Sequence, residues 1–248
     1  MKTQARVVVI GGGVVGVATL YHLAKKGWSD VVLIERKELT SGSTWHAAGL
    51  LPLFNMSYSV GQVHKHSVSL YQNLEQDTGK DVGFRKVGNI RLALNQDRMD
   101  EYHQYAGVAA TIGVEVKFLT PREVKELWPL CNTEGLKGAI IHPEDGYIQP
   151  ADLTQALATG ARNFGAEIYR QTRVTSLEQS SSGDWVVTTD KGNIKCEHVV
   201  SATGSFARQT GEMVGLDVPV IPVQHQFIVT EPHPEIVKRK KEGKPEMG

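Results

Sequence analysis

The stretch VVVIGGGVVG, residues 7–16, joins an apolar β-branched run directly to a G-x-G-x-x-G motif. Residues 7–10 predict a buried strand, because β-branched side chains favour strands. Residues 17–26 carry apolar side chains at helical spacing, and Gly27 follows as a stop signal. A second apolar run, residues 31–34, ends at Glu35. Together they predict a βαβ unit with an acidic residue at its far end, which is the context that a dinucleotide-binding motif requires.

The glycines of this motif have separate tasks in nucleotide binding. Gly11 permits the tight turn, Gly13 lets the backbone approach a pyrophosphate, and Gly16 lets the helix pack close to the strand. The helix begins near Val14 and Val15, where unpaired N–H groups and a partial positive charge favour phosphates. We therefore expect a nucleotide here and not merely a glycine-rich turn of another α/β domain.

The acid at the end of the second strand bears on which nucleotide binds. Glu35 can accept hydrogen bonds from ribose hydroxyls and disfavours a 2′-phosphate. Arg36 beside it weakens that exclusion. The motif alone leaves NAD and FAD both open.

Composition sets broad limits on the rest. The 248 residues can bury one large core or two modest ones, and 27 basic residues balance 27 acidic ones. That balance gives no electrostatic case for binding nucleic acid or a membrane surface. Cys131 and Cys196 share no short motif, so ordinary thiols in a reducing compartment are expected. No apolar run approaches a membrane span of about 20 residues, and no metal site is predicted.

A segment of small and hydroxyl residues, LTSGSTWHAAGL, follows at residues 39–50. Its glycines let backbone lie close to a ligand, and its hydroxyls can donate hydrogen bonds. From the residues alone His46 is ambiguous, because a lone histidine in such a stretch is more often a cap or packing residue than a reactive group. Its place after the Glu35 strand favours a position near the cofactor. The candidate cofactor-binding residues here are Gly42, Ser43, Thr44, Trp45, His46, Ala47, Ala48, Gly49 and Leu50.

The pattern between residues 82 and 149 breaks the βαβ rhythm. It predicts an α+β insertion with two short antiparallel strands in 82–94, a helix over 96–112, and a capped helix from Thr120-Pro121-Arg122-Glu123 to Leu127. Helix–strand alternation resumes at Pro150. Residues 219–230 predict a strand that contains His225, and 233–248 predict a solvated loop. The predicted domains are thus 1–81 with 150–216, and 82–149 with 217–248.

Residues 7–50 resemble the start of the glycine/D-amino-acid oxidase family of flavoproteins. The stretch STWHAAG, residues 43–49, is similar to the dimethylglycine and sarcosine dehydrogenase branch of that family. The resemblance continues through residues 79–93 and 138–150 and on to the last residues. It implies a Rossmann-like FAD-binding domain of α/β class with an inserted α+β substrate domain.

The resemblance also implies roles for single residues. In this branch a histidine at the position of His46 carries FAD covalently through a ring nitrogen. Val174 is implied to lie near the adenine, and Ala202 and Gly204 near the pyrophosphate. Phe206 stands where the family usually has another aromatic residue, and a core role for it is an equal reading. His225 is implied to lie beside the flavin, although the pattern alone favours a core histidine.

The implied activity is FAD-dependent oxidation of an N-methyl amino acid, dimethylglycine or sarcosine, with hydride passing from an N-methyl carbon to the flavin. The implied partners are that small substrate and an electron-transfer flavoprotein. Folate would bind only through a C-terminal region that relatives carry and this chain lacks, and the chain resembles an N-terminal portion of them. We expect a cytoplasmic protein, or a mitochondrial matrix protein if it comes from a eukaryote. The alternatives are a non-catalytic regulatory homologue and a different FAD- or NAD-dependent oxidoreductase.

Overall fold

A computed structural model describes residues 1–226 and 228–244, which form two compact units. The first unit comprises residues 1–48, 73–82 and 149–225, and the second comprises 49–72, 83–148 and 226–248. Each unit has its own sheet structure and its own buried core. Among the described residues, no helix combines the length and the apolar character needed to span a bilayer.

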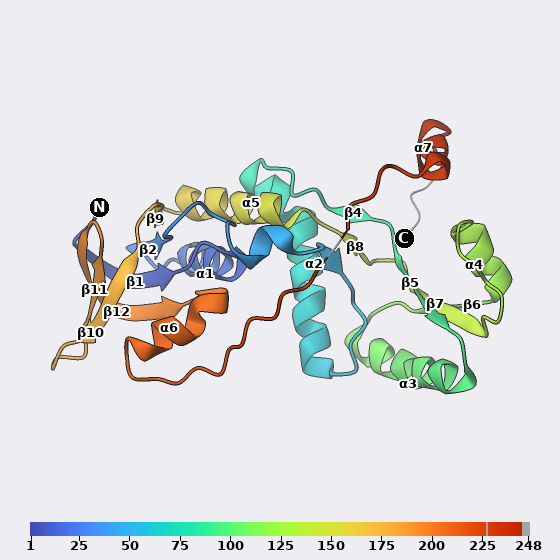
Figure 1. Cartoon of the computed structure of the whole chain (residues 1–248), viewed down its shortest axis with the longest axis horizontal. Coiled ribbons are helices and arrows are strands. Elements are labelled where there is room, and N and C mark those ends of the chain that lie inside the picture. The colour runs from blue at the N-terminus through green and yellow to red at the C-terminus, as the bar shows by residue number, and fades with distance from the viewer. Residues whose placement is uncertain (227, 245–248) are drawn as a thin grey trace. The chain divides into compact units, whose positions relative to one another are not determined.

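The first unit is built on a six-stranded sheet in the order β10-β11-β12-β1-β2-β9 (Figure 1). Its four-stranded part, β12-β1-β2-β9, is parallel, and the β10–β11 hairpin extends it in antiparallel fashion. The strands are β1 (Gln4–Ile10), β2 (Val31–Ile34), β9 (Glu167–Tyr169), β10 (Val174–Gln179), β11 (Trp185–Thr189) and β12 (Gly192–Ser201). The predicted parallel α/β arrangement is therefore confirmed.

Helices connect these strands as the βαβ pattern requires. Helix α1 links β1 to β2 and packs against α5, where a Cβ on Gly160 would stand 2.6 Å from the Tyr21 ring. The helices of this unit are α1 (Val14–Lys25), α5 (Pro150–Asn163), α6 (Ala207–Glu212) and the short 3₁₀ turns η1 (Ser43–His46) and η2 (Gly204–Phe206). Strand β12 pairs with β11 along residues 192–196 and with β1 along residues 195–201, so it joins the hairpin to the parallel part of the sheet.

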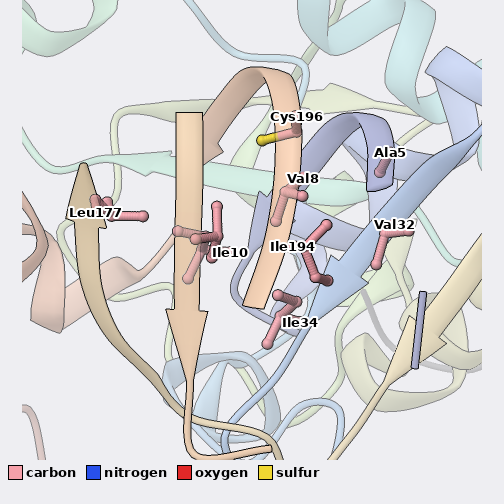
Figure 2. Packing of buried hydrophobic residues seen from close by; sticks show 9 residues of the cluster. Ala5, Val8, Ile10, Val32, Ile34, Leu177, Ile194 and Cys196 are labelled. Carbon is pink, nitrogen blue, oxygen red and sulfur yellow. The ribbon is translucent and has the colours of Figure 1, made fainter. Parts of the chain in front are cut away.

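The core of the sheet is aliphatic (Figure 2). Val8 and Val32, in the two central strands, are completely buried, and Ile194 of β12 and Val187 of β11 are buried with them. At roughly 25 cal/mol per Å² of apolar surface, each such side chain contributes about 2 kcal/mol. Val8 lies opposite Val32 and Val187 lies opposite Ile194 on neighbouring strands, so this packing favours the register that places the glycine motif.

The second unit contains two three-stranded sheets, ordered β3-β8-β4 and β5-β7-β6. Their strands are β3 (Leu50–Leu51), β4 (Arg85–Lys86), β5 (Asn89–Ala93), β6 (Lys117–Leu119), β7 (Gly138–His142) and β8 (Gly146–Tyr147). The helices are α3 (Gln96–Ile112), α4 (Pro121–Leu127) and α7 (Pro234–Lys241), and α2 (Tyr58–Thr78) runs from this unit into the first. The capping box predicted at Thr120 and Glu123 is present.

Three expectations are corrected in this unit. The two strands of 82–94 do not pair with each other: β4 pairs with β8, and β5 pairs with β7. Gly88 between them, at φ 79°, turns the chain and donates its N–H to the backbone carbonyl of Asp145. Residues 49–72 belong to this unit rather than to the first, because Leu50 pairs with Tyr147 and Leu53 packs in its core. The loop predicted over 233–248 holds helix α7, and residues 245–248 lie outside the described residues.

The strand predicted over 219–230 is also absent from its described residues, 219–226 and 228–230. Phe227 lies outside them. A strand needs a hydrogen-bonded neighbour, and none pairs with this segment in the described part of the chain. The side chains of Ile221 and Val223 are 81% exposed. The strand prediction is therefore wrong for these described residues: the segment is apolar, but no described strand pairs with it.

Candidate nucleotide and flavin site

The glycine motif lies at the carboxyl ends of β1 and β12, and its backbone is packed too closely for side chains. A Cβ on Gly11, at φ 118°, would stand 2.3 Å from the carbonyl oxygen of Ala202. A Cβ on Gly16 would stand 2.0 Å from the carbonyl oxygen of Gly11. The roles predicted for these two glycines, a tight turn and a close helix–strand approach, are thus visible as backbone contacts.

Helix α1 presents an N-terminus suited to an anion. Its N-cap, Gly13, supplies no side-chain hydrogen bond, and no acidic residue lies in its first turn, which contains Val15. The Thr44 hydroxyl oxygen accepts the Val14 N–H at 3.0 Å. The remaining first-turn N–H groups have no intrahelical acceptor, and together with the helix dipole they favour a phosphate.

Glu35 is fixed at the edge of this cradle by backbone donors. Its carboxylate accepts the Gly12 N–H at 2.7 Å through Oε2 and the Lys37 N–H at 2.8 Å through Oε1. These bonds keep the carboxylate at the carboxyl end of β2, beside the glycine turn. An acid held there is placed to accept ribose hydroxyls.

The loop after β2 folds back onto the glycine turn. The Thr40 N–H donates to the carbonyl of Gly12 at 2.9 Å, and Thr40 itself takes a left-handed conformation with φ 69°. The 3₁₀ turn η1 then places Thr44 against Val14 and Ser43 within 3.4 Å of the Ser205 hydroxyl. The loop carrying His46 is therefore built around the same cradle, as its position in the sequence suggested.

His46 has an exposed ring whose two nitrogens have different surroundings. Nδ1 lies 3.1 Å from the carbonyl oxygen of Gly42, and the ring lies 4.2 Å from that of Trp45, which is 58% exposed. A carbonyl oxygen only accepts hydrogen bonds, so this contact assigns the proton of the neutral ring to Nδ1. Nε2 then carries the lone pair and is the nucleophilic atom.

Two further candidate residues, Arg36 after β2 and Phe206 after β12, lie against each other. The Arg36 guanidinium lies over the Phe206 ring at 3.8 Å from its centre. Both side chains are exposed, so Phe206 is not a core residue. Gly204, at φ 55°, begins the turn that carries Phe206, whereas Val174 packs against the apolar core of the sheet.

Other candidates are less directly placed. Ala47 and Ala48 are exposed and complete the loop of the first unit, whereas Gly49 and Leu50 belong to the second unit. His225 is exposed in the irregular segment before Phe227, and in the described part of the chain no hydrogen bond or ring contact joins it to the cradle. Its expected place in a strand is therefore wrong for this structure, and its role beside a flavin stays a prediction.

Sequence reasoning missed two residues that shape the site. Thr40 ties the loop to Gly12, and Ser205 faces Ser43. The only signal for Ser205 was a hydroxyl residue next to the small residues that end β12. Nothing marked Thr40, because a threonine with positive φ is not predictable from its neighbours.

The cradle fits an FAD-type dinucleotide. The glycine turn leaves room only for backbone, the α1 N-terminus is open to a pyrophosphate, and Glu35 is placed for a ribose. The His46 loop folds onto this turn and carries an exposed imidazole ring.

Comparison with known proteins agrees with this geometry. The family described as FAD dependent oxidoreductase (DAO) matches residues 6–247. The chain is 44% identical over 241 residues to the mitochondrial dimethylglycine dehydrogenase of Rattus norvegicus, covering 97% of this chain and 28% of that protein. It is 38% identical to the mitochondrial sarcosine dehydrogenase of Homo sapiens, covering 93% of this chain and 26% of that one. The chain thus spans little more than a quarter of the length of these relatives.

Solved structures show the same fold. The L-proline dehydrogenase from P. horikoshii superposes with a TM-score of 0.83 at 29% identity, over 89% of this chain and 58% of that chain. The glycine oxidase from Geobacillus kaustophilus superposes with a TM-score of 0.75 at 33% identity, over 87% and 59%. On the match of its sequence and the agreement of its fold, this chain belongs to the DAO family of FAD-dependent oxidoreductases.

Proposed function

We propose that the chain binds FAD in the cradle of its first unit and contributes to the oxidation of an N-methyl amino acid. Dimethylglycine is the first candidate substrate and sarcosine the second, because dehydrogenases named for these two compounds are among its relatives. When bound, FAD accepts a hydride from the N-methyl carbon. The electron acceptor from FAD is proposed to be an electron-transfer flavoprotein.

The observation that carries this proposal is the state of His46. Its Nδ1–H donates to the Gly42 carbonyl, so Nε2 presents a lone pair at the exposed side of the ring. We propose that this atom would hold the flavin by a bond to its 8α carbon in place of one C–H bond. The two electrons and the proton of that C–H bond would pass to the flavin ring, and the proposed electron-transfer flavoprotein would then reoxidise the reduced ring. Thr44 and Thr40 bind the loop to the glycine turn, so the tether and the pyrophosphate cradle are held as one structure.

The rest of the chain contributes binding and orientation. The α1 N-terminus stabilises the pyrophosphate, Glu35 orients the ribose, and Arg36, stacked on Phe206, flanks the nucleotide. His225 is proposed to face the substrate amine, which must lose its proton before a hydride can leave the neighbouring carbon. A neutral imidazole near the amine can accept that proton.

The test is the intact mass of the purified full-length protein. We expect an added mass of FAD that survives acid denaturation in the wild type and in His103→Ala, which changes an exposed histidine of α3 that stacks on Phe118 in the second unit. We expect no such mass in His46→Ala. A colourless wild-type protein, or an unchanged adduct in His46→Ala, contradicts the proposal.

A regulatory role is the second candidate, because the chain is also 36% identical to the pyruvate dehydrogenase phosphatase regulatory subunit of Mus musculus, over 94% of this chain and 27% of that protein. Anaerobic addition of substrate separates the two. Bleaching of the flavin absorbance by dimethylglycine or sarcosine supports the oxidoreductase, and a flavin that no N-methyl glycine reduces supports the regulatory homologue.

A further inference from the structure

A buried polar pair in the second unit lies outside the nucleotide cradle. His142 ends β7 and Asp145 lies in the turn before β8, and their side chains are 0% and 1% exposed. His142 Nδ1 and Asp145 Oδ2 lie 4.0 Å apart, and neither atom has a hydrogen-bond partner among the described residues. Two buried polar atoms facing each other without a bond need an explanation, because an unpaired group in the interior is costly.

The remaining polar atoms of Asp145 and His142 connect to the backbone of Leu53, Asp145 directly and His142 through Tyr105. Asp145 Oδ1 accepts the Leu53 N–H at 2.9 Å. The Tyr105 hydroxyl donates to the Leu53 carbonyl at 3.3 Å and lies 2.9 Å from His142 Nε2. Because the Tyr105 proton is used on the carbonyl, the tyrosine oxygen accepts, and Nε2 carries the proton of the neutral imidazole.

This assignment leaves a lone pair on Nδ1, directed at Asp145 Oδ2. Three hydrogen bonds of a ring are present: His142 to Tyr105, Tyr105 to the Leu53 carbonyl, and the Leu53 N–H to Asp145. A protonated Asp145 would close the ring by donating to His142 once these two atoms approach from 4.0 Å to hydrogen-bond distance. Burial favours these neutral forms, since it raises the pKa of Asp145 to about 7 and lowers the pKa of His142 to about 4. It also raises the pKa of Tyr105 to about 12.

Leu53 ends a segment that directly follows the His46 loop in the chain. Strand β3 of this segment pairs with β8, and the Ile148 N–H donates to the Gly49 carbonyl at 2.9 Å. In addition, Asp145 accepts the N–H of Leu53, and Tyr105 donates to the carbonyl of Leu53. The chain leaving the loop is therefore held at several points, by β8, by Asp145 in the turn before it and by Tyr105 of α3.

We propose that Asp145 is a positioning residue: through the ring with His142 and Tyr105 it fixes the chain that leaves the His46 loop, and so supports attachment of the flavin at His46. This rests on the proposed tether. The charged group that faces the pair is Arg91 of β5, whose guanidinium lies 4.2 Å from the centre of the Phe54 ring and lowers the pKa of both Asp145 and His142. Helix α3 contributes Tyr105, which closes the ring, and Tyr102, which donates to the Leu92 carbonyl.

Three variants of the full-length protein test the proposal. Asp145→Asn keeps an acceptor for Leu53 and supplies a permanent donor to His142, so it reproduces the closed ring at every pH. Asp145→Ala removes the ring. Glu144→Gln is the matched control, because Glu144 lies in the same turn but pairs with Lys86 at the surface.

The first readout is the rate of covalent flavin attachment at saturating FAD. We expect the rate of Asp145→Ala to fall about tenfold or more, and Glu144→Gln to match the wild type. The ratio of the wild-type rate to that of Asp145→Asn cancels any effect of pH that the two proteins share. It should stay near one below pH 7 and fall about threefold or more above it, where Asp145 ionises and the ring opens.

The second readout, hydrogen exchange at the Leu53 amide, does not depend on flavin. We expect protection in the wild type and Asp145→Asn, and exchange about tenfold faster in Asp145→Ala. Equal attachment rates and equal Leu53 exchange in Asp145→Ala and Glu144→Gln overturn the proposal, as does a pH-independent rate ratio. A wild type without tethered flavin contradicts attachment at His46 itself; the anchor is then upheld only if Asp145→Ala still speeds Leu53 exchange and weakens noncovalent FAD binding.

Discussion

At the scale of single residues, the glycines of the first turn can be tested against each other. Gly16→Ala places a methyl group 2.0 Å from the Gly11 carbonyl oxygen, so the helix must move away from the strand. We expect a loss of about 2–3 kcal/mol in the free energy of unfolding, together with weaker FAD binding. Denaturant titration measures the first and flavin fluorescence the second.

The control for that substitution is another helical glycine. A Cβ on Gly107 of α3 meets nothing within 4 Å, so Gly107→Ala should stabilise by up to about 1 kcal/mol. Equal effects of the two substitutions would contradict the close-approach argument. The role of Gly16 was predictable because its contact partner, Gly11, belongs to the same G-x-G-x-x-G motif.

The buried pair gives a second residue-scale prediction, on pH and stability. The folded-state pKa of Asp145 is raised from 3.8 to about 7, so its contribution to stability falls as pH rises through that window. The folded-state pKa of His142 is lowered from 6.5 to about 4, so its contribution is lost as pH falls from 6.5 to 4. The two slopes oppose each other between pH 4 and 6.5.

Each single variant should therefore show the pH dependence of stability that the other residue causes. Asp145→Asn should lose stability on acidification below pH 6.5, and His142→Gln should lose stability as pH rises from 4 to 7. The slope of either is at most about 1.4 kcal/mol per pH unit. Parallel stability curves for both variants would contradict the opposing titrations. No sequence pattern indicated this pair, because its contacts at Leu53 and Tyr105 come from distant segments.

At the scale of elements, local signals predicted helix starts well. Thr120, Pro121 and Glu123 predicted both the start of α4 and its reciprocal cap, which the structure shows. We expect Thr120→Ala to cost about 1 kcal/mol. A double-mutant cycle with Glu123→Gln, measured by denaturant titration, should show that the two losses are not additive; strictly additive losses would contradict the cap.

Helix α7 shows where local signals were read too narrowly. Pro234 is its first residue, and His233 caps it through Nδ1, which accepts the Glu235 N–H at 3.3 Å. Histidine is not among the usual capping residues, so the sequence predicts a charged loop here even though a proline stands at the first helical position. Four basic residues in the last turn then complement the helix dipole.

At the scale of the whole molecule, the sequence predicted two parts but assigned two segments differently from the structure: residues 49–72 belong to the second unit and residues 217–225 to the first. Residues 49–72 read as a continuation of the nucleotide domain because they follow it in the chain. They belong to the second unit through contacts with β8 and with a core built from residues far along the sequence. The periodic pattern of apolar residues indicates which residues are buried, but not which of the two cores they pack into.

This division leads to a prediction about the ligand. The cradle residues from Gly11 to Glu35 and from Ala202 to Phe206 all lie in the first unit, which has its own core. FAD that binds only the folded cradle stabilises that unit by about 2.7 kcal/mol at a concentration one hundred times its dissociation constant. In calorimetry of the full-length protein, we expect FAD to raise the unfolding temperature of the first unit. The gain should survive dialysis in the wild type, because the tether cannot dissociate, and should be lost on dialysis in His46→Ala. A gain that persists after dialysis of His46→Ala would mean that affinity alone, without the tether, keeps the flavin in its cradle.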